Sequence, residues 1–109
     1  MINSDVSELF NSEDEAKQVL ENSRKKIDEL DNDLINVIYE RTSLAEDIVK
    51  AKTYLGMDIY DANREKNVHE KAKRLANEKN IDKDILDQIM TMLAILSKRE
   101  QKHILDNLE

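Results

Sequence analysis

Residues 27–55, IDELDNDLINVIYERTSLAEDIVKAKTYL, decide the fold, because their apolar side chains recur at alternating spacings of three and four. This spacing predicts one continuous apolar seam along a long α-helix. The seam consists of Ile27, Leu30, Leu34, Val37, Leu44, Ile48, Ala51 and Leu55. The same pattern asks for an apolar residue at position 41, where the sequence has Arg41, a side chain that stays charged.

Arg41 has two interpretations. A polar residue at a seam position can fix the register of a helical pairing. A buried guanidinium also needs an anion, and no acid occupies a neighbouring seam position, so the anion comes from elsewhere in the fold or from a ligand. Lys52, eleven residues on, lies within about 20° of Arg41 on the helix face and about 16 Å along the axis. Such a pair can grip a small molecule with negative charge at both ends.

The composition predicts a single helical domain. Among 109 residues, 39% are hydrophobic and 38% charged, with one Phe, three Tyr and no Trp, so the core must be aliphatic. The absence of cysteine excludes a disulfide framework, thiol catalysis and a cysteine-ligated metal. His69 and His103 lie far apart without ligand spacing. We therefore assign no metal and no cofactor.

Neither a membrane nor nucleic acid is an expected partner. The sequence lacks a run of about 18 apolar residues, and its start, MINSDVSELFNSEDE, lacks the basic end and apolar stretch of a signal peptide. The net charge of −7, with cations interspersed among acids, argues against binding to a phosphate backbone. We expect a cytoplasmic protein.

The helix signals predict an all-α chain of three helices, one long and two shorter. Ser12 and Glu15 resemble a capping box, so the first helix should begin near residue 13, after a flexible N-terminal tail of residues 1–11. Gly56 should end this helix near residue 55. Residues 12–109 then form the helical domain.

Two further amphipathic helices are expected after Gly56. Asp61 is a credible N-cap for a helix over 61–79, with the apolar stripe Val68, Ala72, Leu75 and Ala76. A third helix should run from near Asp82 towards Leu108. One broad apolar face is predicted for it, made of Ile85, Leu86, Ile89, Met90, Met92, Leu93, Leu96, Ile104 and Leu108.

The length of the first helix predicts a dimer. About 40 helical residues span about 60 Å, whereas a compact globule of this size is about 35 Å across. The overhanging seam needs a second chain, and an intertwined symmetric homodimer is the simplest arrangement. The alternative is a plain coiled-coil spacer, in which the two later helices serve no purpose.

Polar residues also mark the later helices. Asp61, Arg64 and Glu65 occupy the first turn of the second helix, where acids also serve capping and the helix dipole. Ser97 and Gln101, one turn apart, continue the apolar stripe of the third helix. They form either the polar wall of a pocket or an exposed helix end.

Taken in order, these positions resemble the all-helical (AroQ-type) chorismate mutases. The resemblance extends over about residues 20–105 without a gap and rests on SRKKIDELDNDLINVIYERTSLAEDIVKAK, YDANRE and ILSKREQ. The matching positions are Arg24, Arg41, Lys52, Asp61, Arg64, Glu65, Ser97 and Gln101. Ile95 and Leu96 depart from the family, since many relatives carry acids just before the serine, and should alter packing beside the pocket.

The resemblance implies an isomerase that converts chorismate to prephenate by an intramolecular [3,3] rearrangement, in phenylalanine and tyrosine biosynthesis and without a cofactor. By resemblance, Arg24 and Arg41 bind substrate carboxylates, and Lys52 touches a carboxylate and the ether oxygen. Gln101 donates to the same oxygen, and Glu65 holds the ring hydroxyl. The remaining wall is formed by Asp61, Arg64 and Ser97.

Arg24 is implied to act in the partner subunit's site. It lies about 25 Å before Arg41 along the helix, too far to reach the same small ligand from one chain. Two other functions stay open: an isochorismate pyruvate-lyase of the same fold, and a non-enzymatic helical interaction module. Glu65, which reads the hydroxyl of the mutase substrate, favours the mutase.

Overall fold

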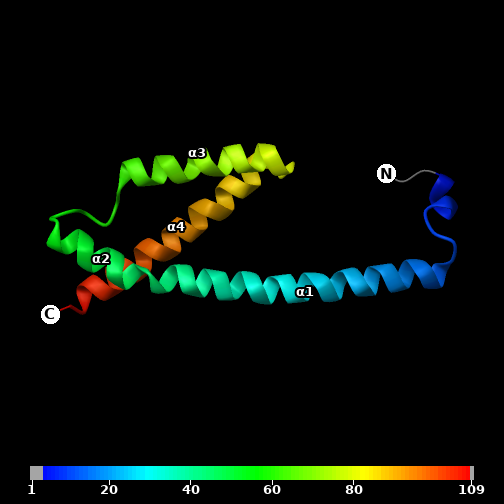
Figure 1. Cartoon of the computed structure of the whole chain (residues 1–109), viewed down its shortest axis with the longest axis horizontal. Coiled ribbons are helices and arrows are strands. Elements are labelled where there is room, and N and C mark those ends of the chain that lie inside the picture. Colours follow the sequence, from blue (N-terminus) through cyan, green and yellow to red (C-terminus); the bar gives the residue numbers. More distant parts are fainter. Residues whose placement is uncertain (1–3, 109) are drawn as a thin grey trace. The chain divides into compact units, whose positions relative to one another are not determined.

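A computed structural model describes residues 4–108 and contains only helices, with no strand, over that range. A short 3-10 helix, η1 (Ser4–Glu8), precedes α1 (Glu13–Ser43), α2 (Ala45–Tyr54), α3 (Ala62–Lys79) and α4 (Lys83–Asp106) (Figure 1). The three predicted helical segments are therefore present, the first of them interrupted at Leu44. Residues 1–3 of the predicted tail and Glu109 of the predicted domain lie outside the described residues.

The interruption at Leu44 has a local cause. The Leu44 N–H donates to the carbonyl of Arg41, only three residues back, at 3.3 Å. Just before it, the hydroxyl of Thr42 donates to the carbonyl of Ile38 at 2.8 Å, and Ser43 bonds in the same way at 2.6 Å to a carbonyl three residues back. Hydroxyls that bond to the preceding turn compete with backbone donors and bend helices. The Thr-Ser pair thus accounts for an interruption of one residue, Leu44, whose backbone keeps right-handed helical angles (φ −71°, ψ −13°).

Residues 1–37 form one unit, whose described part is η1 and most of α1. The side chain of Ser12 accepts a hydrogen bond from the Glu15 N–H at 3.0 Å, which confirms the predicted cap. No residue of α1 is buried. The seam residues Ile27, Leu30, Leu34 and Val37 are between 51% and 57% exposed. The apolar seam exists, but its own unit does not cover it.

Residues 38–109 form the second unit, in which α4 packs against both α2 and α3. Its buried apolar side chains are small, namely Ala45, Val49, Ala72 and Ala76. Small side chains allow helix axes to approach closely. A hydrogen bond between Nδ1 of His69 on α3 and Oδ1 of Asp87 on α4, 2.5 Å long, also joins the two helices. This packing places one face each of α2, α3 and α4 towards a common space.

The broad apolar face predicted for the last helix divides into two. Leu86, Met90 and Leu93 are partly buried. A second row is 41% to 63% exposed and consists of Ile85, Ile89, Met92 and Leu96. Their spacings of four, three and four make this row another helical seam without cover. We call it the α4 stripe.

Gly56 ends α2 as predicted, in a left-handed conformation with φ +70°. Its N–H donates to the carbonyl of Thr53 at 3.2 Å, and the Met57 N–H donates to the carbonyl of Lys52 at 2.8 Å. These two bonds form a Schellman motif, which satisfies carbonyls left free at a helix end. The chain is thereby turned back towards α3.

The N-cap predicted at Asp61 is also confirmed, and Asp82, near which the third helix was expected to begin, caps α4. The Asp61 side chain accepts a hydrogen bond from the Arg64 N–H at 3.1 Å. Asp82 accepts from the N–H groups of Asp84 and Ile85, both at 3.0 Å. Each carboxylate satisfies donors that have no partner within the helix. The start of α3, where three of the predicted site residues lie, is thus fixed locally.

Gly56→Ala should lower the free energy of unfolding by about 1 kcal/mol, because a left-handed backbone strains any residue with a Cβ. A Cβ at this position meets no atom within 4 Å, so packing adds nothing to the effect. Gly56→Asn should lose less, since Asn tolerates this conformation. Urea unfolding at one protein concentration measures all three proteins. Equal stability of Gly56→Ala and wild type would rule out the left-handed turn in solution.

Candidate active site

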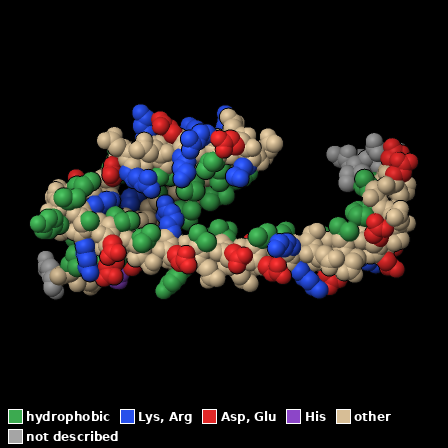
Figure 2. Space-filling view, in the orientation of Figure 1, with side chains coloured by type: hydrophobic (Ala, Val, Ile, Leu, Met, Phe, Trp, Pro, Cys, Tyr) green, Lys and Arg blue, Asp and Glu red, His purple; other side chains and the backbone are tan. Residues whose placement is uncertain are grey.

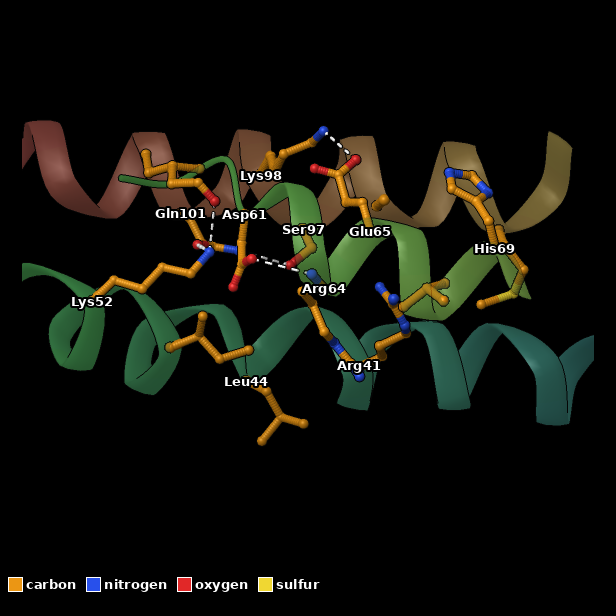
Figure 3. Close-up of a pocket in the computed structure, with 15 residues that line it drawn as sticks. Arg41, Leu44, Lys52, Asp61, Arg64, Glu65, His69, Ser97, Lys98 and Gln101 are labelled. Atoms are coloured by element: carbon orange, nitrogen blue, oxygen red, sulfur yellow. Dashed lines mark hydrogen bonds and ion pairs between the residues drawn. The ribbon is translucent and has the colours of Figure 1, made fainter. Parts of the chain in front are cut away.

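A cavity of about 370 Å³ lies within the second unit, and side chains from the end of α1 and from α2, α3 and α4 line it (Figure 3). Its size suits a small molecule. Seven of the eight predicted site residues line it: Arg41, Lys52, Asp61, Arg64, Glu65, Ser97 and Gln101. The eighth, Arg24, is an exposed residue of α1 in the first unit and does not line this cavity.

Most of the remaining wall is apolar. It consists of Leu44, Ile48, Ile59, Val68, Met90 and Ala94. Apolar walls lower the local dielectric and strengthen the polar contacts made inside. Ile95 and Leu96, where the sequence departs from the family pattern, are not among the lining residues, and Leu96 belongs to the α4 stripe.

Arg41 is partly buried, and its guanidinium donates from Nη1 to the carbonyl of Leu93 at 3.1 Å. This contact joins the end of α1 to the middle of α4. A neutral carbonyl satisfies one of five N–H donors and leaves the charge uncompensated. The anion that the sequence demanded is therefore not supplied by any described residue within ion-pair distance.

Lys52 sits in a chain of hydrogen bonds. Its ammonium donates to the carbonyl of Ile59 at 2.6 Å and to Oε1 of Gln101 at 3.0 Å. Gln101 is only 4% exposed, and its Nε2 donates to Oγ of Ser97 at 3.1 Å. An ammonium has three N–H donors and an amide nitrogen two. One donor on each of Lys52 and Gln101 thus stays available, from side chains in contact with each other.

Among the described residues that line the cavity, Glu65 and Lys98 are the two that form an ion pair with each other. Lys98 Nζ lies 2.9 Å from Oε1 of Glu65, with the side chains 30% and 23% exposed. The other carboxylate oxygen, Oε2, is buried and has no hydrogen-bond partner among the described residues. A buried carboxylate oxygen normally accepts a hydrogen bond. Glu65 is therefore an acceptor without its donor.

The cavity concentrates positive charge in an acidic protein. The chain carries −7 overall, yet four cationic residues and only two acidic ones line the cavity. Figure 2 shows Lys and Arg side chains gathered around the hollow between α2, α3 and α4. In the described part of the chain, the charged side-chain nitrogens of Arg41, Lys52 and Arg64 form no ion pair within 4.0 Å. Such a site favours a small anion over a cation or neutral molecule.

Two polar residues of the cavity were missed from the sequence. Lys98 lies one turn after Ala94 and almost one turn before Gln101, so its place on the α4 face could have been read from the spacing. His69 lies one turn after Glu65 on α3 and contacts Asp87. Nothing in the sequence indicates the Glu65–Lys98 pair, since 33 residues separate its members.

An all-helical fold with this cationic, partly apolar cavity defines a small-molecule site for an anion. A family model, chorismate mutase type II, matches residues 23–102, and the chain belongs to that family of isomerases. A chorismate mutase of Methanocaldococcus jannaschii is 41% identical over 83 residues, which cover 76% of this chain and 84% of the relative. No solved structure matches significantly. The resemblance inferred from the sequence is confirmed.

Residues 4–108 contain no helix both long and apolar enough to cross a membrane. Over the same range no group of three or more His, Cys, Asp or Glu side chains could hold a metal ion.

Proposed function

We propose that the cavity binds chorismate and catalyses its rearrangement to prephenate, a step of phenylalanine and tyrosine biosynthesis. The observation that carries this proposal is the set of cations without acid partners, Arg41, Lys52 and Arg64, in a cavity of a chain from this family. Chorismate has two carboxylates, a ring hydroxyl and the ether oxygen whose bond to the ring breaks. The cavity offers side chains that match the ether oxygen, the hydroxyl and one carboxylate, and the proposed dimer supplies Arg24 for the other carboxylate.

The reaction needs no nucleophile and no proton transfer, so catalysis depends on holding the substrate folded and stabilising charge in the transition state. As the C–O bond breaks, the ether oxygen gains negative charge. The remaining N–H donors of Lys52 and Gln101 come from side chains 3.0 Å apart and can reach one oxygen together. Donors fixed before the reaction stabilise that oxygen more in the transition state than in the ground state.

The other groups bind the substrate. Arg41 offers its uncompensated guanidinium to a carboxylate, which answers the need for an anion at this seam position. Arg64 adds a second cation on the α3 side of the cavity. Oε2 of Glu65 accepts a hydrogen bond from the ring hydroxyl, which supplies the missing donor. Asp61 and Ser97 complete the wall, Asp61 by fixing the start of α3 and Ser97 by holding the Gln101 amide.

A homodimer completes the site in this proposal. The α1 seam and the α4 stripe are both exposed, and large uncovered apolar surfaces mark association sites. A second copy of the chain offers matching seams, as a symmetric pair requires. Arg24 would then enter the partner's cavity and bind the second carboxylate. We expect the dimer to be cytoplasmic and to use no metal or cofactor.

An assay for the conversion of chorismate to prephenate tests the function directly. The reaction is monitored by the loss of chorismate absorbance, and the product is identified. Lys52→Ala should lower kcat about 10²–10³-fold, the usual effect of removing one donor at a reacting oxygen. Lys50→Ala is the matched control, because Lys50 lies on the same helix, is exposed and pairs with Glu46. Release of pyruvate from isochorismate, without mutase activity, would identify the lyase. A protein inactive with both substrates would favour the interaction module.

Mixed dimers test the role of Arg24 in the partner's site. Arg24→Ala and Arg41→Ala proteins should each be nearly inactive. Unfolding and refolding them together should restore roughly a quarter of the wild-type sites, because about half of the dimers are mixed and each has one intact site of two. The measurement is activity against the mixing ratio, with mixed dimers isolated by distinct tags. Confirmed mixed dimers without activity would show that Arg24 does not act across the dimer.

Gln101→Glu should make the rate depend on pH. A carboxyl group donates to the ether oxygen only while protonated, whereas an amide donates at any ordinary pH. The pKa of the new acid sets the pH at which the rate changes, and it is lowered by Lys52 beside it and raised by burial at this position. The ratio of variant to wild-type kcat/KM should therefore fall as pH rises through that pKa, with folding checked at each pH. A ratio that does not change with pH would show that Gln101 does not donate to the reacting oxygen.

A further inference from the structure

Lys98 is the cavity cation that the proposed roles leave unused, and its surroundings differ from those of the other three. Its ammonium lies 2.9 Å from Oε1 of Glu65 and 5.4 Å from the centre of the Tyr60 ring. It thus lies between α3 and the loop that precedes it, while its own backbone belongs to α4. The dashed contact in Figure 3 shows Lys98 reaching across the top of the cavity to Glu65.

The contact with Lys98 makes the two carboxylate oxygens of Glu65 unequal. Oε1 is taken by the ammonium, whereas Oε2 is buried without a partner. A carboxylate held at one oxygen by a charged donor has its plane fixed, because such bonds are short and directional. The Tyr60 ring makes a further, cation–π contact with the same ammonium. The position of Oε2 therefore depends on Lys98.

Lys98 also sets the charge that a substrate meets at this end of the cavity. A carboxylate without a counter-charge would repel a dianion, and the repulsion is strong where water is excluded. Paired with Lys98, Glu65 can accept a hydrogen bond from a hydroxyl while the pair stays neutral overall. Orientation and neutralisation both act on the substrate through Glu65.

We propose that Lys98 is a positioning residue for hydroxyl recognition: it holds Glu65 with Oε2 free to accept from the ring hydroxyl, and it cancels the carboxylate charge. This proposal rests on the proposed function, since it assumes that chorismate occupies the cavity. It assigns Lys98 no direct contact with the substrate.

Steady-state kinetics of Lys98→Met with chorismate tests the proposal. A remote hydroxyl is held about equally in the ground and transition states, so the variant should raise KM about tenfold, the effect of one charged hydrogen bond, and change kcat by less than about threefold. Lys98→Arg keeps the cation and should recover most of the wild-type KM. Lys102→Met is the matched control, because Lys102 is an exposed residue of the same helix that pairs with Asp106.

A double-mutant cycle with Glu65→Gln separates action through Glu65 from direct binding. If Lys98 acts through the carboxylate, Lys98→Met should change KM by less than about twofold in the Glu65→Gln background. An undiminished effect in that background would overturn the proposal and identify Lys98 as a direct substrate ligand. An unchanged KM in Lys98→Met alone would overturn it as well.

A substrate analogue lacking the ring hydroxyl measures how strongly the enzyme prefers the hydroxyl. A purely structural role of Lys98 would leave this preference unchanged. Wild type should prefer chorismate to the analogue in kcat/KM, and Lys98→Met should lose most of that preference. Should Lys98→Met not fold, Lys98→Gln replaces it in the same comparisons. A wild-type protein without mutase activity refutes the proposed function, whereas an active wild type with an unchanged preference in the Lys98 variant refutes only the role of Lys98.

Discussion

The ammonium of Lys52 joins more of the site than any other group. It binds the carbonyl of Ile59 in the loop after α2 and the amide of Gln101 on α4, so it connects three elements around the cavity. Its own backbone carbonyl accepts from Met57, which turns the loop so that Ile59 can face the ammonium. The left-handed turn at Gly56 makes that return possible. One cation is thus positioned by a helix end, a loop and a second helix at once.

Charge placement explains how an acidic chain can hold an anion. Among the described residues, five exposed acids pair with lysines three or four residues away, as Glu46 does with Lys50. Those pairs are exposed and contribute little to stability. Inside the cavity, Arg41 and Lys52 are instead held by neutral oxygens, which fix their positions without cancelling their charge. Leaving cations without counter-charge lowers stability in the free protein and is typical of functional sites.

The apolar core is small, and this matters for the same site. Within residues 4–108 the buried apolar residues are three alanines and Val49, while the α1 seam and the α4 stripe are exposed. A domain of about 100 residues ordinarily buries most of its large aliphatic side chains. Cover by a second copy would supply the missing apolar contacts, and in the proposed dimer it would also supply Arg24. Stability and activity would then depend on the same association.

Local features were predictable from the sequence because they depend on neighbours within about four residues. Ser12, Asp61 and Asp82 cap helices through side-chain contacts two or three residues away, and Gly56 ends a helix through its own backbone conformation. Arg41 was visible as a cation inside an apolar seam. The resemblance added Arg24 and gave the other marked positions their roles, and seven of the eight line one cavity.

Tertiary packing decided what depends on how helices meet. The Glu65–Lys98 pair joins residues 33 apart, and the Lys52–Gln101 bond joins residues 49 apart, so no spacing along one helix reveals them. The same packing divided the apolar face of α4 into a partly buried side and the exposed α4 stripe, although both rows have the same periodicity. The sequence determined which residues each helix presents. The angles and separations between helices, set by burial of small side chains such as Ala45 and Ala76, determined which of those residues touch.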